Sequence, residues 1–476
     1  MNPGVQRFKY IFADILSASA VWLLFNVLRY DEVASYLGYT SLTSYLTYTV
    51  VWEVQLAIPF FWLTLYYFSG YYNKPFGKSR LGEFFLTLAT VVCGVTLLFF
   101  ILILNDLPRS FHIYYHLYFA LLALQFVFTW LPRLFITQKG LNKVKRREWS
   151  LNVLIIGTGP KAVQIAGDLY NMGYRIVGFV TEDNPPANEA GTADIAVDPS
   201  LLLGTTNDLP DIVPTRRIDE IVVAVESTDS AKRTLVLYPL YRYKCPVKIL
   251  ADNLNMLLPL SKVKIKTIRG LPLVDVTDNN FSGAEQNIKF WMDKCISALA
   301  LVLLSPVYLY IAWRVKKDSP GPALFRQERI GYRGRPFMMY KFRTMYTGSE
   351  NDGPLLSNGN DSRVTPFGRL MRKYRIDELP QFWNVLKGDM SLVGPRPERR
   401  YFIDRIVSRA PFYYLLHNVR PGLTSLGMVK YGYASNVDQM IERLEYDMLY
   451  YENMSLVFDL TILVYTIKTV ITGKGI

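Results

Sequence analysis

The stretch RKYRIDELPQFWNVLKGDMSLVGPRPE, residues 372–398, decides how the rest of this chain is interpreted. Its centre is a pair of adjacent carboxylates, Asp377 and Glu378, followed by Pro380, a residue type that commonly opens a helix. The pattern predicts a short helix that ends at Gly388 and has both acids at its start. Unpaired N–H groups and the helix dipole favour anions there, so an ionised carboxylate could serve as a nucleophile or a metal ligand.

Basic residues surround the two acids. Arg372 and Arg375 precede them, and Arg396 follows between two prolines. Carboxylates ringed by arginines suit phosphate chemistry that proceeds through a divalent cation. The plainer alternative is an Asp that caps a helix followed by a solvated face. The Gly-Pro-Arg-Pro turn close behind favours phosphate chemistry.

Composition narrows the class of protein. The chain has 476 residues, half of them hydrophobic, and a net charge of +13. A basic excess fits nucleic acid, anionic lipid or phosphate substrates. Because no DNA- or RNA-binding motif is present, we expect no nucleic acid partner and favour the membrane surface and nucleotide-sugar phosphates. The three cysteines lie far apart and show no metal-binding spacing.

Four apolar stretches near the N-terminus each approach the length needed to cross a bilayer. They cover roughly residues 10–28, 46–68, 84–104 and 112–136. Basic residues gather between the second and third stretches and after the fourth, whereas the other two loops have few. The positive-inside rule therefore predicts a four-helix transmembrane bundle over 1–137, with both of its ends in the cytoplasm.

A soluble α/β pattern replaces the apolar one at Leu151. Residues 138–255 are predicted to form a cytoplasmic Rossmann-like domain, with a glycine-containing turn at Gly157, Gly159 and Ala162 after the first strand. Glu182 and Asp183 stand where an acid would contact a ribose. Both dinucleotide binding and a purely structural or regulatory role stay open. Residues 256–287 are predicted to be a linker that adds one or two strands.

The remaining segment, 288–476, begins with another apolar stretch. Ser305 and Pro306 break it midway, and basic residues flank both of its ends. Basic flanks on both sides predict a re-entrant helix over about 288–314 that enters the membrane and returns to the cytoplasmic side. The alternative is a kinked spanning helix, which would place the following domain outside, away from nucleotide sugars.

The stretch at 372–398 resembles the signature of the bacterial sugar transferases, the polyprenyl-phosphate glycosyl-1-phosphate transferases. The resemblance runs from about Lys289 to the C-terminus and includes LLSPVYLY, FRQERIGYRGRPFMMYKFRTM and VRPGLTSLGMV. The N-terminal part is similar to the larger subgroup. The expected fold is thus a membrane protein with a four-helix transmembrane bundle, a Rossmann-like α/β domain, and a mixed α/β catalytic domain with a re-entrant membrane helix.

The resemblance also implies the activity. Family members work at the cytoplasmic side of the bacterial inner membrane, in contact with its lipid, and start capsule, O-antigen or exopolysaccharide assembly. They move a sugar-1-phosphate from a UDP-sugar to undecaprenyl phosphate and release UMP. In the predicted route Asp377 attacks the sugar-linked phosphorus, and Mg²⁺ offsets the repulsion between anionic reactants.

The same resemblance assigns residues. Asp377 and Glu378 match the catalytic acids, and with Asp447 they are the expected Mg²⁺ ligands. The expected phosphate contacts are Arg372, Arg396, Arg420, Lys341 and Arg343. The last two could instead be structural. One stretch, LGMVKYGYA from Leu426, departs from the family pattern and leaves the sugar or uridine specificity open.

Two other functions compete with the transferase. A membrane-associated nucleotide-sugar oxidoreductase or epimerase would use the Gly157–Ala162 turn and would not need Asp377. A non-catalytic protein would scaffold other polysaccharide enzymes. The bundle and the extra domain could support a homodimer. The sequence does not identify the sugar, although the larger subgroup favours UDP-glucose or UDP-galactose.

Overall fold

The computed structural model describes residues 3–36, 38–39, 41–76, 78–103, 110–181, 197–225, 236–237, 239–243, 245–250, 266–268, 271–277, 281–349 and 361–473. The chain divides into two compact units. The first contains residues 1–150 and 282–288, and the second contains residues 151–281 and 289–476.

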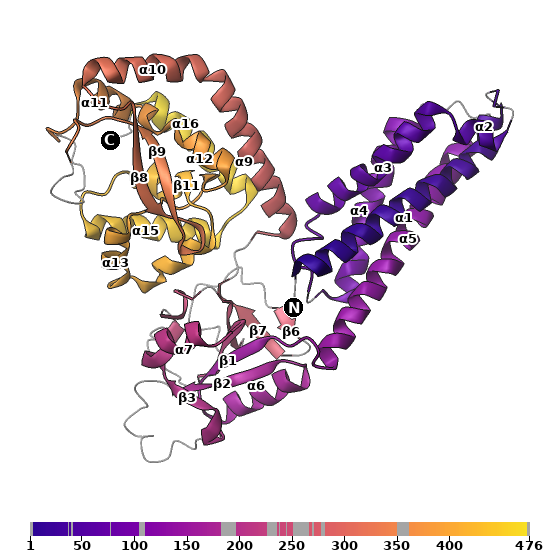
Figure 1. Cartoon of the computed structure of the whole chain (residues 1–476), viewed down its shortest axis with the longest axis horizontal. Helices are drawn as coiled ribbons and strands as arrows, with labels where there is room; N and C mark the ends of the chain where they lie inside the picture. Colours follow the sequence, from indigo (N-terminus) through magenta and orange to yellow (C-terminus); the bar gives the residue numbers. More distant parts are fainter. Residues whose placement is uncertain are drawn as a thin grey trace. The chain divides into compact units, whose positions relative to one another are not determined.

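Long helices make up the first unit (Figure 1). They are α1 Pro3–Glu32, α3 Thr49–Phe68, α4 Arg80–Leu98 and α5 Phe111–Lys145, with the short α2 Leu42–Leu46 after α1. A π-helical turn extends α4 through Ile103. Among the described residues, four helices are long and apolar enough to cross a membrane. This confirms the four predicted apolar helices.

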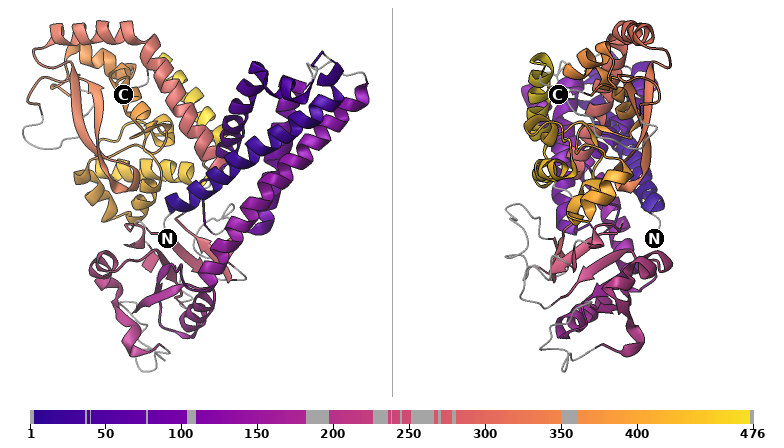
Figure 2. Two further views of the ribbon diagram at one scale, coloured as in Figure 1. Left: turned by 45° about the vertical axis from the view of Figure 1, so that its right-hand side comes forward. Right: turned by 90° about the vertical axis from the view of Figure 1, so that its left-hand side faces the viewer.

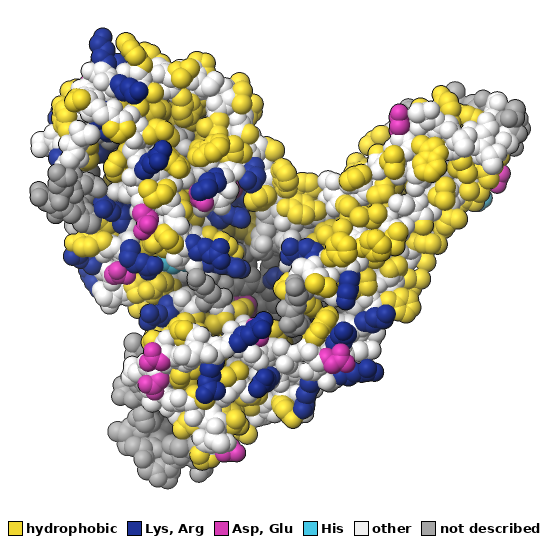
Figure 3. Space-filling view, in the orientation of Figure 1, with side chains coloured by type: hydrophobic (Ala, Val, Ile, Leu, Met, Phe, Trp, Pro, Cys, Tyr) yellow, Lys and Arg dark blue, Asp and Glu magenta, His cyan; other side chains and the backbone are white. Residues whose placement is uncertain are grey.

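Large apolar side chains cover the outside of this bundle, as the yellow surface over α1 and α3–α5 shows (Figure 3). Phe12 is 52% exposed, Phe60 is 72% exposed and Phe119 is 61% exposed. Large exposed apolar surfaces mark contacts with lipid or with other proteins, and over helices of this length they fit a bilayer rather than an aqueous surface.

A buried ion pair lies inside the bundle. Arg133 of α5 donates from Nε and Nη2 to both carboxylate oxygens of Asp14 in α1, at 2.9 and 2.8 Å. Its Nη1 donates to Thr87 of α4 at 3.1 Å. The guanidinium also lies over the rings of Tyr66 and Tyr71, 4.0 and 3.7 Å from their centroids. Because ionised groups in an apolar bundle must be paired, this contact holds α1, α4 and α5 in register.

A seven-stranded mixed sheet occupies the first part of the second unit. Its elements are β1 Asn152–Ile156, α6 Pro160–Asn171, β2 Arg175–Thr181, β3 Leu202–Thr205, α7 Leu209–Thr215, β4 Glu220–Val223, β5 Val247–Leu250, β6 Lys266–Ile268 and β7 Leu271–Asp275. The strand order is β3-β2-β1-β4-β5-β7-β6. The first five strands of that order are parallel, whereas β7 and β6 are antiparallel additions. The predicted linker therefore supplies two strands to this sheet.

The rest of the second unit contains a two-stranded hairpin, which lies at the periphery of this part of the chain in both views (Figure 2). Its elements are β8 Leu324–Ile330, β9 Pro336–Phe342, α11 Pro366–Lys373, α12 Gln381–Lys387, β10 Ser391–Val393, α13 Arg400–Val407, β11 Gly422–Thr424, α14 Leu426–Lys430, α15 Val437–Glu452 and α16 Leu456–Ile471. The turn between β8 and β9 contains the glycines Gly331 and Gly334. The hydrophobic core of this part of the chain includes Val385, Leu392, Ile403 and Ile462, all almost fully buried.

Two consecutive helices, α9 Gly283–Leu303 and α10 Ser305–Asp318, meet at an angle of 63° (Figures 1 and 2). The break falls at Leu304, directly before the predicted Ser305–Pro306 pair. The Ser305 hydroxyl donates to the carbonyl of Val302 at 2.8 Å, and Pro306 occupies the first turn of α10, where its missing N–H costs nothing.

The shorter of these two helices, α10, contacts the segment that carries Asp377 and Glu378. Tyr308 of α10 donates its hydroxyl to the carbonyl of Leu379 at 2.7 Å. Ile311 and Val315 pack with Phe342 of β9 and Met371 of α11. The opposite side of α10 stays apolar and open, with Leu309 74% exposed.

Candidate active site

Asp377 and Glu378 lie in a single 3₁₀ turn, Ile376–Glu378, rather than at the start of an α-helix. The helix α12 begins only at Gln381, after Pro380, and ends at Gly388, whose φ of 98° confirms the predicted glycine cap. The N–H groups of Glu378 and Leu379 bond to carbonyls within the turn. They are not available to an anion, so the expectation that a helix N-terminus stabilises the acids is wrong.

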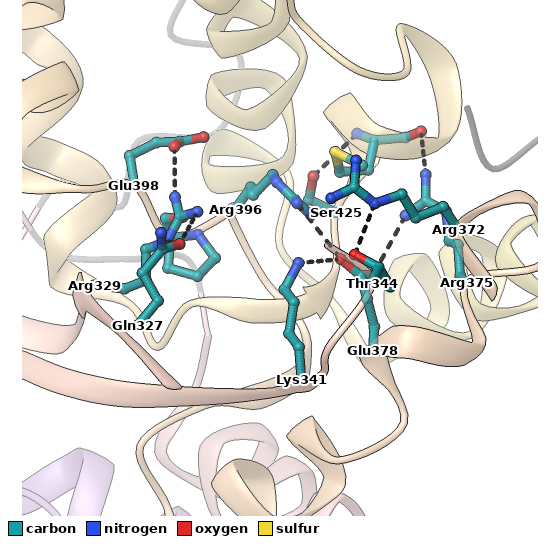
Figure 4. A network of polar contacts seen from close by, with 12 residues as sticks. Gln327, Arg329, Lys341, Thr344, Arg372, Arg375, Glu378, Arg396, Glu398 and Ser425 are labelled. Atoms are coloured by element: carbon teal, nitrogen blue, oxygen red, sulfur yellow. Dashed lines mark hydrogen bonds and ion pairs between the residues drawn. The ribbon is translucent and has the colours of Figure 1, made fainter. Parts of the chain in front are cut away.

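Three basic side chains stabilise the ionised carboxylate of Glu378 (Figure 4). The Lys341 ammonium of β9 is 2.8 Å from Glu378 Oε1, and the Arg396 guanidinium is 3.5 Å from the same oxygen. Arg375 approaches the other oxygen at 3.9 Å. Burial alone would raise the pKa of Glu378, but these three charges outweigh burial and hold that pKa well below its ordinary value. Glu378 is therefore ionised at any physiological pH.

Asp377 is placed differently although it is the adjacent residue. It is 5% exposed, and its Oδ1 accepts no hydrogen bond from the described part of the chain. Burial and the charge of Glu378 raise the pKa of Asp377 to about 6, against the opposing charges of Lys341, Arg372 and Arg396. At neutral pH this carboxylate is ionised yet poorly solvated. Such a group is suited to attack an electrophile or to bind a cation.

The backbone of Arg375 and hydrogen bonds of two arginines hold the turn that carries Asp377 and Glu378. Arg375 precedes this turn with a φ of 54°, a left-handed backbone conformation that is unfavourable for residues other than glycine. Its Nη2 donates to the Met428 carbonyl at 3.4 Å. Arg372 of α11 donates from Nε to the Thr344 hydroxyl at 2.9 Å.

Asp447 of α15 fixes the segment that presents Arg396. One carboxylate oxygen accepts the backbone N–H of Arg396 at 3.3 Å, and the other accepts that of Gly427 at 2.9 Å. Glu398, two residues further on, pairs with Arg329 at 3.0 Å and with Arg443 at 2.6 Å. The Arg396 guanidinium is therefore aimed at Glu378 by buried contacts on both sides of its backbone.

Comparison with known proteins now identifies the family. The family model for "Bacterial sugar transferase" matches residues 284–473. A UDP-glucose:undecaprenyl-phosphate glucose-1-phosphate transferase of Escherichia coli K12 is 30% identical over 326 residues, which cover 65% of this chain and 68% of that protein. The chain belongs to the bacterial sugar transferase family.

Two further relatives differ in how much of this chain they match. A UDP-N-acetylgalactosamine-undecaprenyl-phosphate N-acetylgalactosaminephosphotransferase of Aeromonas hydrophila is 47% identical over 188 residues, or 40% of this chain. The match covers 44% of that protein, so this chain spans less than half of its length. An undecaprenyl-phosphate galactose phosphotransferase of Salmonella typhimurium is 27% identical over 100% of this chain and 98% of its own length.

Within this bacterial sugar transferase, the predicted site residues fall into two groups. Lys341 and Arg396 contact Glu378, and the charge of Arg372 acts on Asp377. Arg343 lies elsewhere, because its Nη2 donates to the carbonyl of Ser319 at the end of α10, at 2.6 Å. Arg420 donates from Nε to the carbonyl of Gly388, at the far end of α12, at 3.2 Å. Both arginines bind backbone carbonyls near helix ends.

The predicted set of three Mg²⁺ ligands is not formed. Both carboxylate oxygens of Asp447 accept backbone N–H groups, and the described residues contain no group of three or more Asp, Glu, His or Cys side chains that could hold a metal ion. Asp377 and Glu378 remain as the candidates. Mg²⁺ usually binds one or two carboxylates together with substrate phosphates, so the free oxygen of Asp377 still fits such a site.

The glycine turn of the sheet domain has a structural explanation. Gly157 adopts a φ of 119°, and a Cβ there would lie 2.6 Å from the carbonyl oxygen of Ala224. Gly159 is extended and precedes α6, whose first residue, Pro160, has no N–H to offer a phosphate. Ala162 is fully buried. Glu182 and Asp183 lie outside the described residues.

Two residues of the site were not predicted from the sequence, and a third, Arg375, was predicted only as one of the basic residues around the acids. Gln381 is 2% exposed and its buried Nε2 has no described partner. Tyr433 lies against Arg375 and Arg396. It belongs to the stretch that departs from the family pattern, which was the available signal.

Proposed function

We propose that this bacterial sugar transferase moves a sugar-1-phosphate from a UDP-sugar to undecaprenyl phosphate and releases UMP. The observation that carries the proposal is the free, poorly solvated carboxylate oxygen of Asp377 beside a carboxylate that three cations hold ionised. Relatives named for this reaction with glucose, galactose and N-acetylgalactosamine support it.

The proposed route has two displacements. An oxygen of Asp377 attacks the sugar-linked phosphorus of the UDP-sugar, and the bond from that phosphorus to the bridging oxygen breaks. UMP leaves with the electron pair, and an aspartyl-phosphosugar remains. The phosphate oxygen of undecaprenyl phosphate then attacks the same phosphorus and frees the Asp377 carboxylate.

The cations have separate tasks in this route. Lys341, Arg375 and Arg396 neutralise Glu378, so the site can accept the additional negative charge of a diphosphate. Arg372 lowers the pKa of Asp377 and helps to keep the nucleophile ionised. Mg²⁺, held by Asp377 or Glu378 together with the substrate phosphates, would supply further neutralisation of charge.

We also propose that α9 and α10 form a re-entrant membrane segment, with both ends on the cytoplasmic side of the inner membrane. The bend at Leu304, the exposed apolar residues Leu299, Val302 and Leu309, and the basic residues that end α10 support this topology. A membrane-impermeant thiol reagent should fail to label Asp318→Cys, in a cysteine-free background, from outside intact spheroplasts. Labelling from outside would indicate a spanning helix.

The reaction is tested with the purified chain, Mg²⁺, undecaprenyl phosphate and a panel of UDP-sugars. UMP release by the wild type and its loss in Asp377→Asn are expected. A radiolabelled sugar should remain on the protein when the lipid acceptor is omitted, and Asp377→Asn should carry none. Turnover by Asp377→Asn comparable to that of the wild type would overturn the covalent route. The panel identifies the sugar, and through it the pathway.

A further inference from the structure

The ring of Tyr433 lies at the edge of the acidic pair. Its centroid is 5.4 Å from the Arg375 guanidinium carbon and 5.3 Å from that of Arg396. These are two of the three cations that pair with Glu378. Tyr433 is nevertheless 38% exposed, so these contacts leave part of the residue accessible.

This position fits a substrate contact better than a packing role alone. Cation–π contact with two guanidiniums holds the ring in place without adding charge to the site. An aromatic ring whose remaining surface is open offers an apolar platform to whatever occupies the neighbouring space.

We propose that Tyr433 contacts the hexose of the donor and determines which sugar is accepted, an inference that rests on the proposed function. The phosphorus that Asp377 attacks carries the hexose directly. The uracil base is separated from it by a second phosphate and a ribose. A ring packed against the arginines around Asp377 and Glu378 is therefore nearer to the hexose than to the base.

The configuration of the hexose determines how well it can stack on the Tyr433 ring. In a galacto-configured hexose, whose 4-hydroxyl is axial, the hydrogens on C3, C4 and C5 lie on one side and form an apolar patch that can stack on an aromatic ring. In a gluco-configured hexose the hydrogen on C4 points to the opposite face, so this patch is smaller. Tyr433 therefore favours galacto-configured donors. UDP-galactose and UDP-N-acetylgalactosamine should lose more than UDP-glucose when the ring is removed.

The experiment compares Tyr433→Ala and Tyr433→Phe with Tyr431→Ala, in the full chain. Tyr431 is the matched control, because its hydroxyl donates to Glu442 at 2.6 Å, away from the acidic pair. KM and kcat are measured for UDP-glucose, UDP-galactose and UDP-N-acetylgalactosamine, together with the Kd of UDP, which has no sugar. Tyr433→Ala should raise KM for the galacto-configured donors by about tenfold, as expected for one lost aromatic contact.

The other measurements separate a sugar contact from support of the arginines. The Kd of UDP should not change, and Tyr433→Phe and Tyr431→Ala should resemble the wild type. Equal weakening of UDP and all three UDP-sugars, or a parallel fall of kcat with unchanged KM ratios, would overturn the inference. If Tyr433→Ala does not fold, Tyr433→Trp replaces it, and unchanged sugar preference in that variant counts against the inference. Absence of turnover in the wild type would instead refute the proposed function.

Discussion

The two adjacent acids should change the stability of the fold in opposite directions when their charges are removed. Burial and the charge of Glu378 raise the pKa of Asp377 from 3.8 to about 6, which corresponds to a free-energy difference on the order of a few kcal/mol. Because the folded state binds this proton more tightly than the unfolded state, the ionised Asp377 carboxylate destabilises the fold at neutral pH. Asp377→Asn, neutral at every pH, should unfold at a higher temperature than the wild type there.

Glu378→Gln should have the opposite effect. The pKa of Glu378 is lowered, so its carboxylate stabilises the fold above the unfolded pKa of 4.5, and that stabilisation is lost as the pH falls toward the folded pKa. Gln would leave Lys341, Arg375 and Arg396 buried without their counter-charge. Removing one partner of a buried pair costs about 3–5 kcal/mol.

Thermal unfolding of the purified protein in detergent, followed by intrinsic fluorescence over a pH series, measures both effects. A change of 1 kcal/mol shifts Tm by roughly 2–4 °C in a domain of 150–250 residues. The advantage of Asp377→Asn should disappear as the pH falls from about 6 to below 3.8. The surface variant Asp438→Asn, whose side chain is 66% exposed, is the control and should unfold with the wild type. Shifts of the same sign in both variants, or a pH-independent gain for Asp377→Asn, would refute the reasoning.

Three further predictions concern activity and the bundle. The rate of UMP release should fall as the pH drops through the raised pKa of Asp377, because only the ionised carboxylate attacks; a rate that is flat across this range would exclude it as the nucleophile. Lys341→Met should move this acid limb to higher pH and Lys341→Arg should restore it, as measured by pH–rate profiles; an unmoved limb in Lys341→Met would contradict the charge contact. Asp14→Leu should cost about 3–5 kcal/mol by leaving Arg133 unpaired, and adding Arg133→Met should recover most of the lost Tm; no recovery would argue against direct pairing.

Much of the architecture follows from local patterns. The length and polarity of the apolar stretches predicted the four long helices, because a bilayer requires about 20 apolar residues in each crossing helix. The bend at Ser305–Pro306 and the cap at Gly388 follow from backbone constraints that act within a few residues. The acidic pair was found for the same reason, since its two members and several of its basic neighbours are close in sequence.

Tertiary structure decided the chemistry of that pair. Lys341 comes from a hairpin and Arg396 from a turn that Asp447 anchors, and only folding brings both to Glu378. The same packing leaves one oxygen of Asp377 without a hydrogen bond from the described residues. The sequence contained equally plausible cations in Arg343 and Arg420, which instead bind carbonyls at helix ends. The pKa of a carboxylate depends on its burial and on its distances to charges. Those distances are properties of the packed chain, and for this reason two neighbouring acids acquire opposite shifts.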